Sequence, residues 1–391
     1  MEDIYFSKSS KAYDNGDITS HSGSGDITSH SGSSRDITSH SGSRDITSHS
    51  GSRAPLQEVD IWSDTGRAFK NESISGNSGK KSAAKMNKKR KKKKHIIRKI
   101  LILALCIVLA FSGTLFTLVS VIGYTKSELE VNEYVASSSL NSSFGVTNIL
   151  LLGVDAENGE SGRSDTMMLL SLDFIHMKIK LTSFLRDSYV YIPSRGKSAK
   201  LNSAYAYNGG QGAVDTIEYN FGVDISHFVK VDFTMFTKII DNLGGIDLEV
   251  TEKEAKFINR TTRHTVEYGD SVHLDGAKAL VYARIRKLDS DYMRTQRQRK
   301  VISALIKKAK TAGPAAMLKS LREVLPLVET DMGSGEITAL ALKCVCALLF
   351  DIEQKQVPDD SMMTTGYVGS EWVEKPDLDK CKAALYEFIY G

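Results

Sequence analysis

Charged side chains lie at the ends of three neighbouring apolar segments. Asp155 follows the run NILLLGV, Arg163 and Asp165 precede the next run, and Arg186 ends a third. Neighbouring strand ends can bring such side chains to one rim of a sheet, where ligands commonly bind. Carboxylates attract a hard cation such as Mg²⁺, and guanidinium groups grip phosphate oxygens in bidentate fashion. The spacing therefore indicates a site for a phosphorylated ligand, although a surface ion pair is the alternative for any one residue.

A second group of basic residues lies later in the chain. Arg294 and Gln298 are spaced i, i+4 and would share one helix face, with Arg297 beside them. No acidic residue occurs from Arg294 to Lys300, and like charges on one helix repel each other unless an anion compensates them. A phosphorylated ligand is such an anion, and an idle basic surface helix is the alternative. The arginines of this region are Arg284, Arg286, Arg294, Arg297 and Arg299.

Other catalytic arrangements have little support. The sequence contains no G-x-S-x-G motif, and no cysteine has a histidine nearby that could activate it, which argues against a hydrolase triad. The glycine cluster at 209–212 lacks the Lys and Ser/Thr of a P-loop. We therefore expect a turn between two helical segments there.

The apolar pattern predicts the elements that position these side chains. Nearly continuous apolar runs indicate buried strands at 148–154, 166–174 and 178–185. Helical patterns follow at 203–219, 233–243, 275–283, 292–309, 315–328 and 335–350. This mixture predicts the α/β class, as a sandwich with a central mixed sheet and helices on both sides.

A run of 23 residues without charge, Ile100–Ile122, is long enough to cross a bilayer. It is too long, and too far from the N-terminus, for a signal peptide. A basic block precedes it and acidic residues follow it, so the positive-inside rule places the N-terminal tail in the cytoplasm. We expect a single-pass cell-membrane protein with a cytoplasmic tail at 1–95, a membrane helix at 96–123, a linker at 124–146 and one extracytoplasmic domain at 147–391.

The tail is rich in Ser, Gly, Asp and Asn and has few large apolar residues, which predicts disorder. The octet DITSHSGS occurs in it four times, beginning at Asp17, Asp26, Asp36 and Asp45. The net charge of the chain is +4, but the stretch from Lys80 to Lys99 holds 12 of the 51 basic residues and no acid. The rest of the chain is therefore acidic, which argues against nucleic acid as a partner.

Three cysteines lie in the predicted outer domain: Cys344, Cys346 and Cys381. Cys344 and Cys346 are too close in sequence for an unstrained bridge to each other. A bridge from one of them to Cys381 and a set of buried thiols both remain open.

Seven ordered segments resemble the LytR-CpsA-Psr family of bacterial cell-envelope proteins, over about residues 147–309. The segments are NILLLGVD, GRSDTMMLLSL, TSFLRDSYVYIP, KLNSAYAYNGG, VDFTMFTKIIDNLGGIDLEV, LDGAKALVYARIR and RTQRQRKVI. The resemblance implies a membrane-anchored phosphotransferase. Such an enzyme moves a glycopolymer, such as teichoic acid or capsule polysaccharide, from a polyprenyl pyrophosphate carrier to a hydroxyl of peptidoglycan.

The resemblance also implies roles for individual residues. Asp155 and Asp165 correspond to acidic positions associated with Mg²⁺. The positions that correspond to pyrophosphate-binding arginines are Arg163, Arg186, Arg284 and Arg286. The positions in the later polar cluster are Arg294, Arg297 and Gln298, and Lys200 and Asn202 lie in the matching KLNSAY segment. We expect Asp165, Arg186 and Arg284 to be catalytic.

Two other functions stay open on the sequence. One is a non-catalytic envelope receptor that binds lipid pyrophosphates and signals through its cytoplasmic repeats. The other is a polyprenyl pyrophosphatase, which would release the carrier with no acceptor present. Turnover of the lipid-linked donor would distinguish an enzyme from a receptor. Dependence on an acceptor would distinguish a phosphotransferase from a pyrophosphatase.

Overall fold

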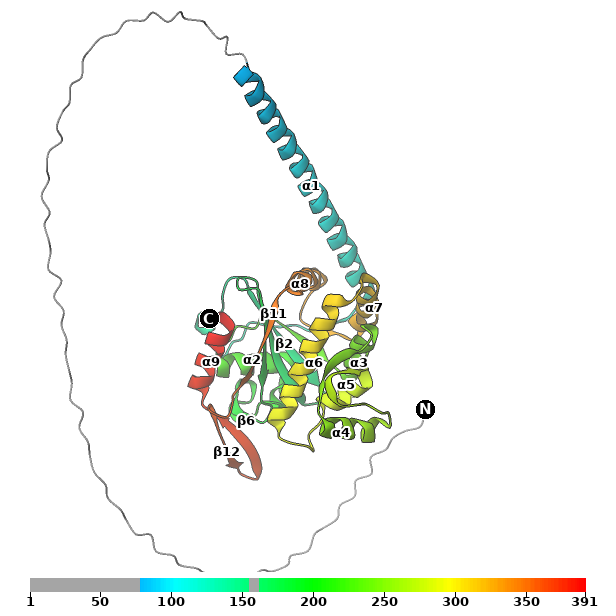
Figure 1. Cartoon of the computed structure of the whole chain (residues 1–391). Helices are drawn as coiled ribbons and strands as arrows, with labels where there is room; N and C mark the ends of the chain where they lie inside the picture. The colour runs from blue at the N-terminus through cyan, green and yellow to red at the C-terminus, as the bar shows by residue number, and fades with distance from the viewer. Residues whose placement is uncertain (1–77, 155–161) are drawn as a thin grey trace, which may run out of the picture. The chain divides into compact units, whose positions relative to one another are not determined.

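The computed structural model describes residues 78–154 and 162–391 (Figure 1). Our predictions for the disordered tail with its DITSHSGS repeats, and for the metal ligand Asp155, lie outside these residues.

A seven-stranded mixed sheet forms the centre of the domain, with the strand order β1-β10-β7-β2-β3-β4-β11. The strands β2 (Val146–Val154), β3 (Ser164–Asp173) and β4 (Lys178–Phe184) form an antiparallel meander, as their apolar runs predict. On either side, β7 (His227–Val231) pairs in parallel with β2, and β11 (Asp351–Val357) pairs in parallel with β4. The short strands β10 (Glu329–Thr330) and β1 (Thr125–Lys126) complete one edge.

Helices cover both faces of the sheet, so the α/β prediction is confirmed (Figure 1). Alternate residues of β2 point to opposite faces. Leu150 and Leu152 pack in a cluster with α2 (Ser203–Phe221) and α9 (Leu378–Tyr390). Ile149 and Leu151 lie on the other face, in a cluster with residues of α6 (Asp291–Thr311) and α8 (Ser334–Ala347).

A smaller core lies beside the second face of the sheet. It is formed by α3 (Phe233–Asn242), α4 (Glu252–Thr262), α5 (Gly276–Ala283), α6 and the hairpin of β8 (Ile246–Val250) and β9 (Gly269–Leu274). Asp232 caps α3 by accepting a hydrogen bond from the backbone N–H of Met235 at 2.7 Å, and Asp275 caps α5 in the same way. Such caps fix where each helix begins.

Several elements differ from the predicted pattern. The apolar signal of α4 is weak because only Glu254, Ala255 and Ile258 are buried on it. Strand β11 has the polar sequence DIEQKQV, which is tolerated because it lies at the sheet edge. The helix predicted at 315–328 is α7 (Pro314–Val324), followed by a 3₁₀ turn that contains Pro326, which has no backbone N–H to donate. The elements that the pattern missed also include α9 and the hairpins β5 (Tyr189–Ile192)–β6 (Lys197–Lys200) and β12 (Met363–Val368)–β13 (Glu371–Pro376).

The helix α1 runs over Ser78–Ile122, so it begins earlier than the predicted residue 96 and includes the basic block. Its part from Lys93 to Ile122 is long and apolar enough to cross a membrane. The predicted linker at 124–146 is instead packed on the domain. There, β1 joins the sheet, and the side-chain amide of Asn132 donates to Glu218 Oε2 at 3.0 Å.

The glycine cluster interrupts α2, as predicted. Asn208 and Gly209 have non-helical backbone angles, with a φ of +53° at Gly209. Gly210 then lies directly against the ring of Phe228 on β7. All four cysteines lie in the described part of the chain and none forms a disulfide; Cys381 is a fully buried thiol.

We predict that Gly210→Ala destabilises the fold by about 1–3 kcal/mol, because overpacking a buried contact forces neighbours to move. An added Cβ would lie 2.4 Å from Phe228 Cζ. Gly335→Ala is the matched control: it also lies in a helix, but no atom lies within 4 Å of an added Cβ. Thermal unfolding of the two variants should show a lower melting temperature for the first only.

Candidate active site

The pairing of β3 with β4 brings Asp165 and Arg186 together. In this antiparallel ladder Met167 lies opposite Phe184, and Asp165 and Arg186 lie just beyond that pair. On the other side, Gly153 pairs with Thr166 and Val154 with Ser164, so Asp165 is the extra residue of a β-bulge, which re-aims its side chain. Arg186 Nη1 lies 2.8 Å from Asp165 Oδ1. Strand pairing and the bulge together therefore place one predicted arginine beside one predicted aspartate.

The corner between α5 and α6 brings more arginines to the same carboxylate. Arg286 Nη2 lies 2.6 Å from Asp165 Oδ2. Arg294, in the first turn of α6, donates to the backbone oxygen of Asp165 at 3.4 Å and to Asp291 Oδ2 at 2.8 Å. Asp165 thus contacts Arg186, 21 positions away in the chain, and Arg286 and Arg294, 121 and 129 positions away.

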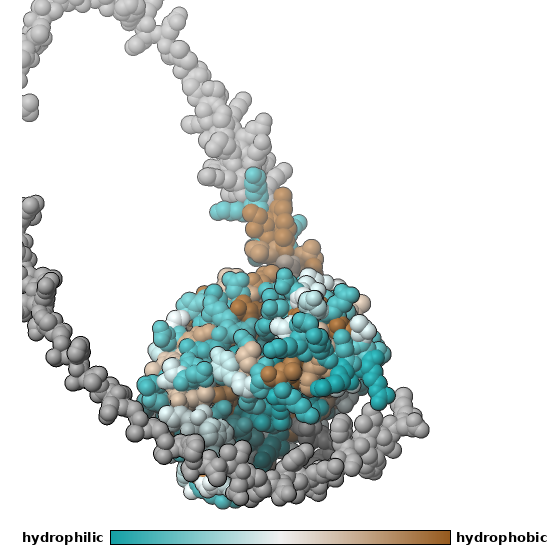
Figure 2. Space-filling view, turned by 60° about the horizontal axis from the view of Figure 1, so that its bottom comes forward, coloured by the Kyte–Doolittle hydropathy of each residue, from teal (hydrophilic) through white to brown (hydrophobic). Residues whose placement is uncertain are grey.

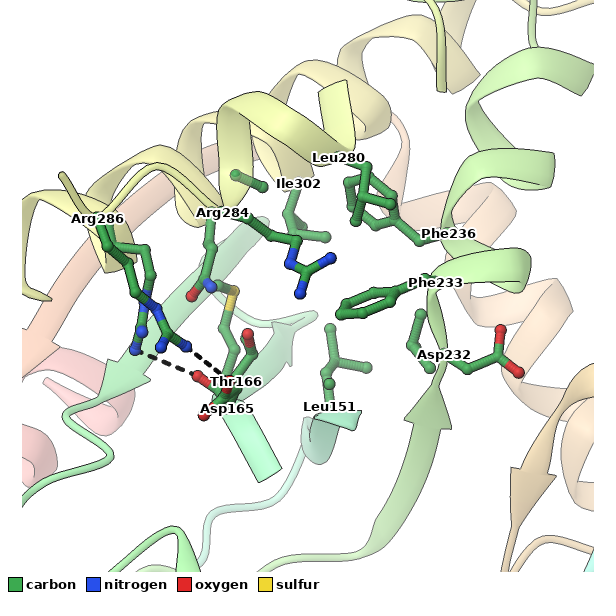
Figure 3. A pocket seen from close by; sticks show the side chains of 16 residues that line it. Leu151, Asp165, Thr166, Asp232, Phe233, Phe236, Leu280, Arg284, Arg286 and Ile302 are labelled. Atoms are coloured by element: carbon green, nitrogen blue, oxygen red, sulfur yellow. Dashed lines mark hydrogen bonds and ion pairs between the residues drawn. The ribbon is translucent and has the colours of Figure 1, made fainter. Parts of the chain in front are cut away.

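Asp165, Arg286 and Arg294 border a pocket between the sheet and the layer of α3, α5 and α6, whereas Arg186 is not among its lining residues (Figure 3). The pocket encloses about 830 Å³, part of it open to solvent. The guanidinium of Arg284 lies over the ring of Phe233, 4.1 Å from its centroid. The apolar residues that line the pocket include Leu151, Met168, Phe236, Leu280 and Ile302. The pocket therefore has an apolar interior and a cationic border.

Asp165 and Arg294 stay ionised at neutral pH. Burial alone would raise the pKa of Asp165, but the hydrogen bond from Arg186 and the charges of Arg186, Arg286 and Arg294 bring it below its ordinary value. Burial lowers the pKa of Arg294 to about 10, which still leaves its guanidinium protonated. Arg294 is 1% exposed, so its charge has lost nearly all contact with water.

Two neighbouring side chains of α6 present unsatisfied polar atoms. Arg294 Nε and Nη1 and Gln298 Oε1 are buried without a hydrogen-bond partner in the described residues. Both residues line the pocket. Buried polar groups are nearly always paired in native proteins, because an unpaired one costs about 1–3 kcal/mol. A polar ligand at the mouth of the pocket would supply the missing partners.

A second set of charges lies behind Arg186. Its Nε lies 3.3 Å from Asp187 Oδ2 and 3.5 Å from Asp291 Oδ1, and Lys200 Nζ lies 3.1 Å from Asp187 Oδ1. Glu374 on β13 joins this set, since its backbone N–H donates to the Asp187 carbonyl at 3.1 Å. Burial, and then the charges of Asp187 and Asp291, raise the pKa of Glu374 to about 7.

Some predicted site residues lie elsewhere. Arg297 is buried and pairs with Glu254 Oε1 at 2.6 Å and with Asp289, so its charge is compensated within the protein and it does not line the pocket. Arg163 is exposed just before β3 and is also outside the lining. Asn202 is buried at the start of α2, and its backbone N–H donates to the Arg186 carbonyl at 3.0 Å. Asn202 and Lys200 thus lie behind Arg186 and not at the pocket.

Sequence reasoning missed three residues of the site. Asp187 and Asp291 both form ion pairs with Arg186, and the ring of Phe233 lies against the guanidinium of Arg284. The i, i+3 spacing of Asp291 and Arg294 was a usable signal, because such pairs meet on a helix. Nothing in the sequence indicated that Phe233 would reach Arg284, since their contact depends on how α3 packs beside the α5–α6 corner.

The described residues contain no cluster of three or more His, Cys, Asp or Glu side chains that could hold a metal by themselves. Asp165 is the one predicted ligand among them. Mg²⁺ needs few protein ligands when a substrate supplies phosphate oxygens, commonly one or two carboxylates. The donor chemistry of this border therefore fits Mg²⁺ only together with a phosphorylated ligand.

The sequence profile of the LytR_cpsA_psr family matches residues 116–387. The chain belongs to the LytR-CpsA-Psr family. The resemblance that the seven segments indicated is thereby confirmed, and the matched region also includes the end of α1 and the residues that we took for a linker.

Curated members of the LytR-CpsA-Psr family carry transferase names. The chain is 36% identical over 186 residues to the polyisoprenyl-teichoic acid–peptidoglycan teichoic acid transferase TagU of Bacillus cereus, over 47% of this chain and 58% of that protein. It is 36% identical over 227 residues to the TagT transferase of Bacillus subtilis, over 56% of this chain and 67% of that protein. The first match thus spans less than two thirds of the relative's length.

The fold is also shared with solved structures. The structure described as "TagT bound to LIIa-WTA" aligns with a TM-score of 0.55 and 26% identity, over 67% of this chain and 99% of that one. The central mixed sheet and its helices are therefore those of LytR-CpsA-Psr proteins.

We predict that protonated Glu374 stabilises the fold at low pH. Its pKa is raised from 4.5 to about 7, so the native state keeps a proton that the unfolded chain releases. This contribution to the free energy of unfolding is fully present below pH 4.5 and is lost as the pH rises toward 7. Its size is on the order of 2 kcal/mol once solvent screening is taken into account.

Melting temperatures of the full chain in detergent, measured from pH 5 to 8, test this prediction. The difference between wild type and Glu374→Gln should change over that range, because glutamine cannot ionise. Glu371→Gln changes an exposed residue of the same strand, and its melting temperature should follow that of wild type at a constant difference over the whole pH range. Parallel curves for Glu374→Gln as well would contradict the assignment.

Proposed function

We propose that this protein is a membrane-anchored phosphotransferase that attaches a glycopolymer, of the teichoic acid or capsule type, to peptidoglycan. The donor would be the glycan linked to a polyprenyl pyrophosphate. One observation carries the proposal: an apolar pocket whose mouth is lined by Arg284, Arg286 and Arg294. The transferase names of the relatives point to the same reaction.

The two parts of the pocket correspond to the two parts of such a donor. An isoprenoid chain is apolar and would be buried against Leu151, Phe236 and Ile302. The diphosphate would accept hydrogen bonds from Arg284 and from the unpaired nitrogens of Arg294. A soluble phosphate ester offers no counterpart to the apolar interior.

The reaction would need no covalent intermediate. A hydroxyl oxygen of the acceptor attacks the phosphorus that carries the glycan, and the bond from this phosphorus to the bridging oxygen breaks. Polyprenyl phosphate leaves, and the proton of the hydroxyl passes to solvent. Negative charge develops on the bridging and phosphoryl oxygens, where fixed guanidinium groups stabilise it. The arginines at the border are held by Asp165 and Asp291, so they need little reorganisation.

Asp165 is a poor proton acceptor in this arrangement, because both of its oxygens accept hydrogen bonds from arginines and its pKa is lowered. We propose that it orients Arg186 and Arg286. With Asp155 it would hold Mg²⁺, which when bound would neutralise charge on the diphosphate.

The proposed topology follows from α1. Its candidate span from Lys93 to Ile122 follows a basic block, so the N-terminus would be cytoplasmic and the domain extracytoplasmic. A membrane anchor confines the enzyme and its lipid-linked donor to one surface, which raises their effective concentration.

Replacing Arg186 tests the function. We expect Arg186→Ala to lower the rate of glycan transfer by about 10²–10³-fold, the usual cost of losing a charge-stabilising donor. The assay follows radiolabelled glycan from a polyprenyl pyrophosphate donor to peptidoglycan, with purified full-length protein in vesicles. Arg260→Ala, at an exposed position on α4, should transfer at the wild-type rate.

The same assay separates the other functions. A receptor would bind the donor without consuming it, and a pyrophosphatase would release the carrier when peptidoglycan is omitted. Normal transfer by Arg186→Ala, or consumption without acceptor by wild type, would count against the proposal.

Two buried arginines of one helix should differ in their response to replacement by methionine. Arg294→Met should lower transfer by about 10²-fold and destabilise the fold less than Arg297→Met, because its partner Asp291 keeps a contact with Arg186 and the change removes nitrogens that have no partner. Arg297→Met should destabilise the fold by about 3–5 kcal/mol, because it leaves Glu254 and Asp289 without their partner. Thermal unfolding and transfer are measured on both; equal destabilisation by the two changes would argue that Arg294 is merely structural.

A further inference from the structure

The end of the sheet opposite Asp165 carries exposed, large apolar side chains. Asp165 lies at the start of β3, whereas Phe144 precedes β2 and Ile175 and Met177 lie in the turn from β3 to β4. Phe144 is 93% exposed, Ile175 57% and Met177 53%. Leu349, which follows α8, is 81% exposed. Exposed apolar residues that gather on one surface indicate a contact with a partner or a membrane.

Backbone contacts join these four residues into one surface. The N–H of Phe174 donates to the Gly145 carbonyl at 3.0 Å, which places Phe144 beside Ile175. A Cβ at Gly145 would lie 2.9 Å from Ile175 Cγ1. The N–H of Asp351 donates to the Met177 carbonyl at 3.3 Å, which brings the segment containing Leu349 to the same turn. We call Phe144, Ile175, Met177 and Leu349 the apolar edge.

Helix α8 connects the end of the candidate membrane span to the apolar edge. α1 packs against α8, and Val119 near the end of α1 is fully buried. Just after α1, Tyr124 Oη lies 3.4 Å from Ser334 Oγ at the start of α8, and Leu349 follows the end of the same helix. Chain that leaves a bilayer through α1 therefore lies one helix length from this edge.

Lysines surround the apolar edge. Lys343 Nζ donates to Thr147 Oγ1 at 3.0 Å, and Lys310 Nζ donates to the Phe350 carbonyl at 2.9 Å, so neither charge is neutralised by these contacts. Lys178 pairs with Glu353 at 2.7 Å, and Asp351 is the exposed acid of this edge. Apolar tips with amines around them are typical of surfaces that rest in a lipid interface, where long basic side chains reach the headgroups. The face that Figure 2 shows is mostly hydrophilic, with an apolar patch among the teal and white residues.

We propose that the apolar edge inserts into the headgroup region of the same bilayer that α1 spans. The partner is a lipid surface, because α8 links the edge to the candidate span and lysines surround its apolar side chains. The proposal requires α1 to be a membrane span but not the transferase reaction.

Docking in this way would orient the pocket. Leu151 and Met168 lie nearer the apolar edge along β2 and β3 than Gly153 and Asp165 do. The apolar interior of the pocket would therefore point toward the bilayer, and the arginines would point away from it. A lipid chain and a soluble acceptor could then reach the site from opposite ends.

Fluorescence quenching by brominated phosphatidylcholine tests the docking on the full chain in vesicles. The native tryptophans are Trp62 and Trp372. In a Trp62→Phe, Trp372→Phe background, Phe144→Trp or Leu349→Trp provides a single reporter on the apolar edge. The control keeps Trp372, which is 51% exposed on β13, as the single reporter.

We expect at least a twofold loss of fluorescence for the reporters at 144 and 349 and little change for Trp372. Vesicles with unbrominated lipid should leave all three unchanged. Equal quenching of Trp372 would mean that the domain has no fixed orientation, and unquenched reporters at 144 and 349 would mean that the edge lies in water; either result overturns the proposal. Because no substrate is present, neither result depends on the transferase activity.

Discussion

The carboxylate of Asp165 is the contact on which the site depends. It accepts from Arg186 on the strand meander and from Arg286 on the α5–α6 corner, and its backbone oxygen accepts from Arg294. Four guanidinium groups in one place would repel each other without acidic partners. Asp165, with Asp187 and Asp291, lowers this repulsion and leaves nitrogens of Arg294 available to a ligand.

Arg294 and Arg297, two of the three buried arginines of α6, use the same charge in different ways. Arg297 is enclosed by Glu254 and Asp289, so its role is to hold α4 and the α5–α6 corner to α6. Arg294 has one carboxylate partner and faces the pocket. The protein tolerates a less compensated charge at Arg294 because binding an anion there recovers the energy that desolvation costs.

The sheet connects the site to the apolar edge. β2 ends and β3 begins near the arginine cluster, and their other ends lie at the apolar edge. A mixed sheet with helices packed on both faces is rigid, so an orientation set at one end is transmitted to the other. In the proposed docking α1 would be more than a tether, because its packing against α8 would set which end of the domain faces the bilayer.

The sequence by itself determined the α/β class, the strands of the meander and the candidate span, because continuous apolar runs have few alternatives to burial. Strand ends also indicated that Asp165 and Arg186 lie at one rim of the sheet, since charged residues follow where the apolar runs stop. The polar edge strand β11 and the helix α4 had no such signal, because they bury few apolar side chains.

Only the tertiary structure decided which arginines face the pocket. Arg294, Arg297 and Gln298 are close on one helix, and spacing cannot tell which side of that helix meets carboxylates. The packing of α6 against α4 and the sheet turns Arg297 toward Glu254 and turns Arg294 and Gln298 toward the pocket. The choice depends on partners far away in the chain, so local sequence could not contain it.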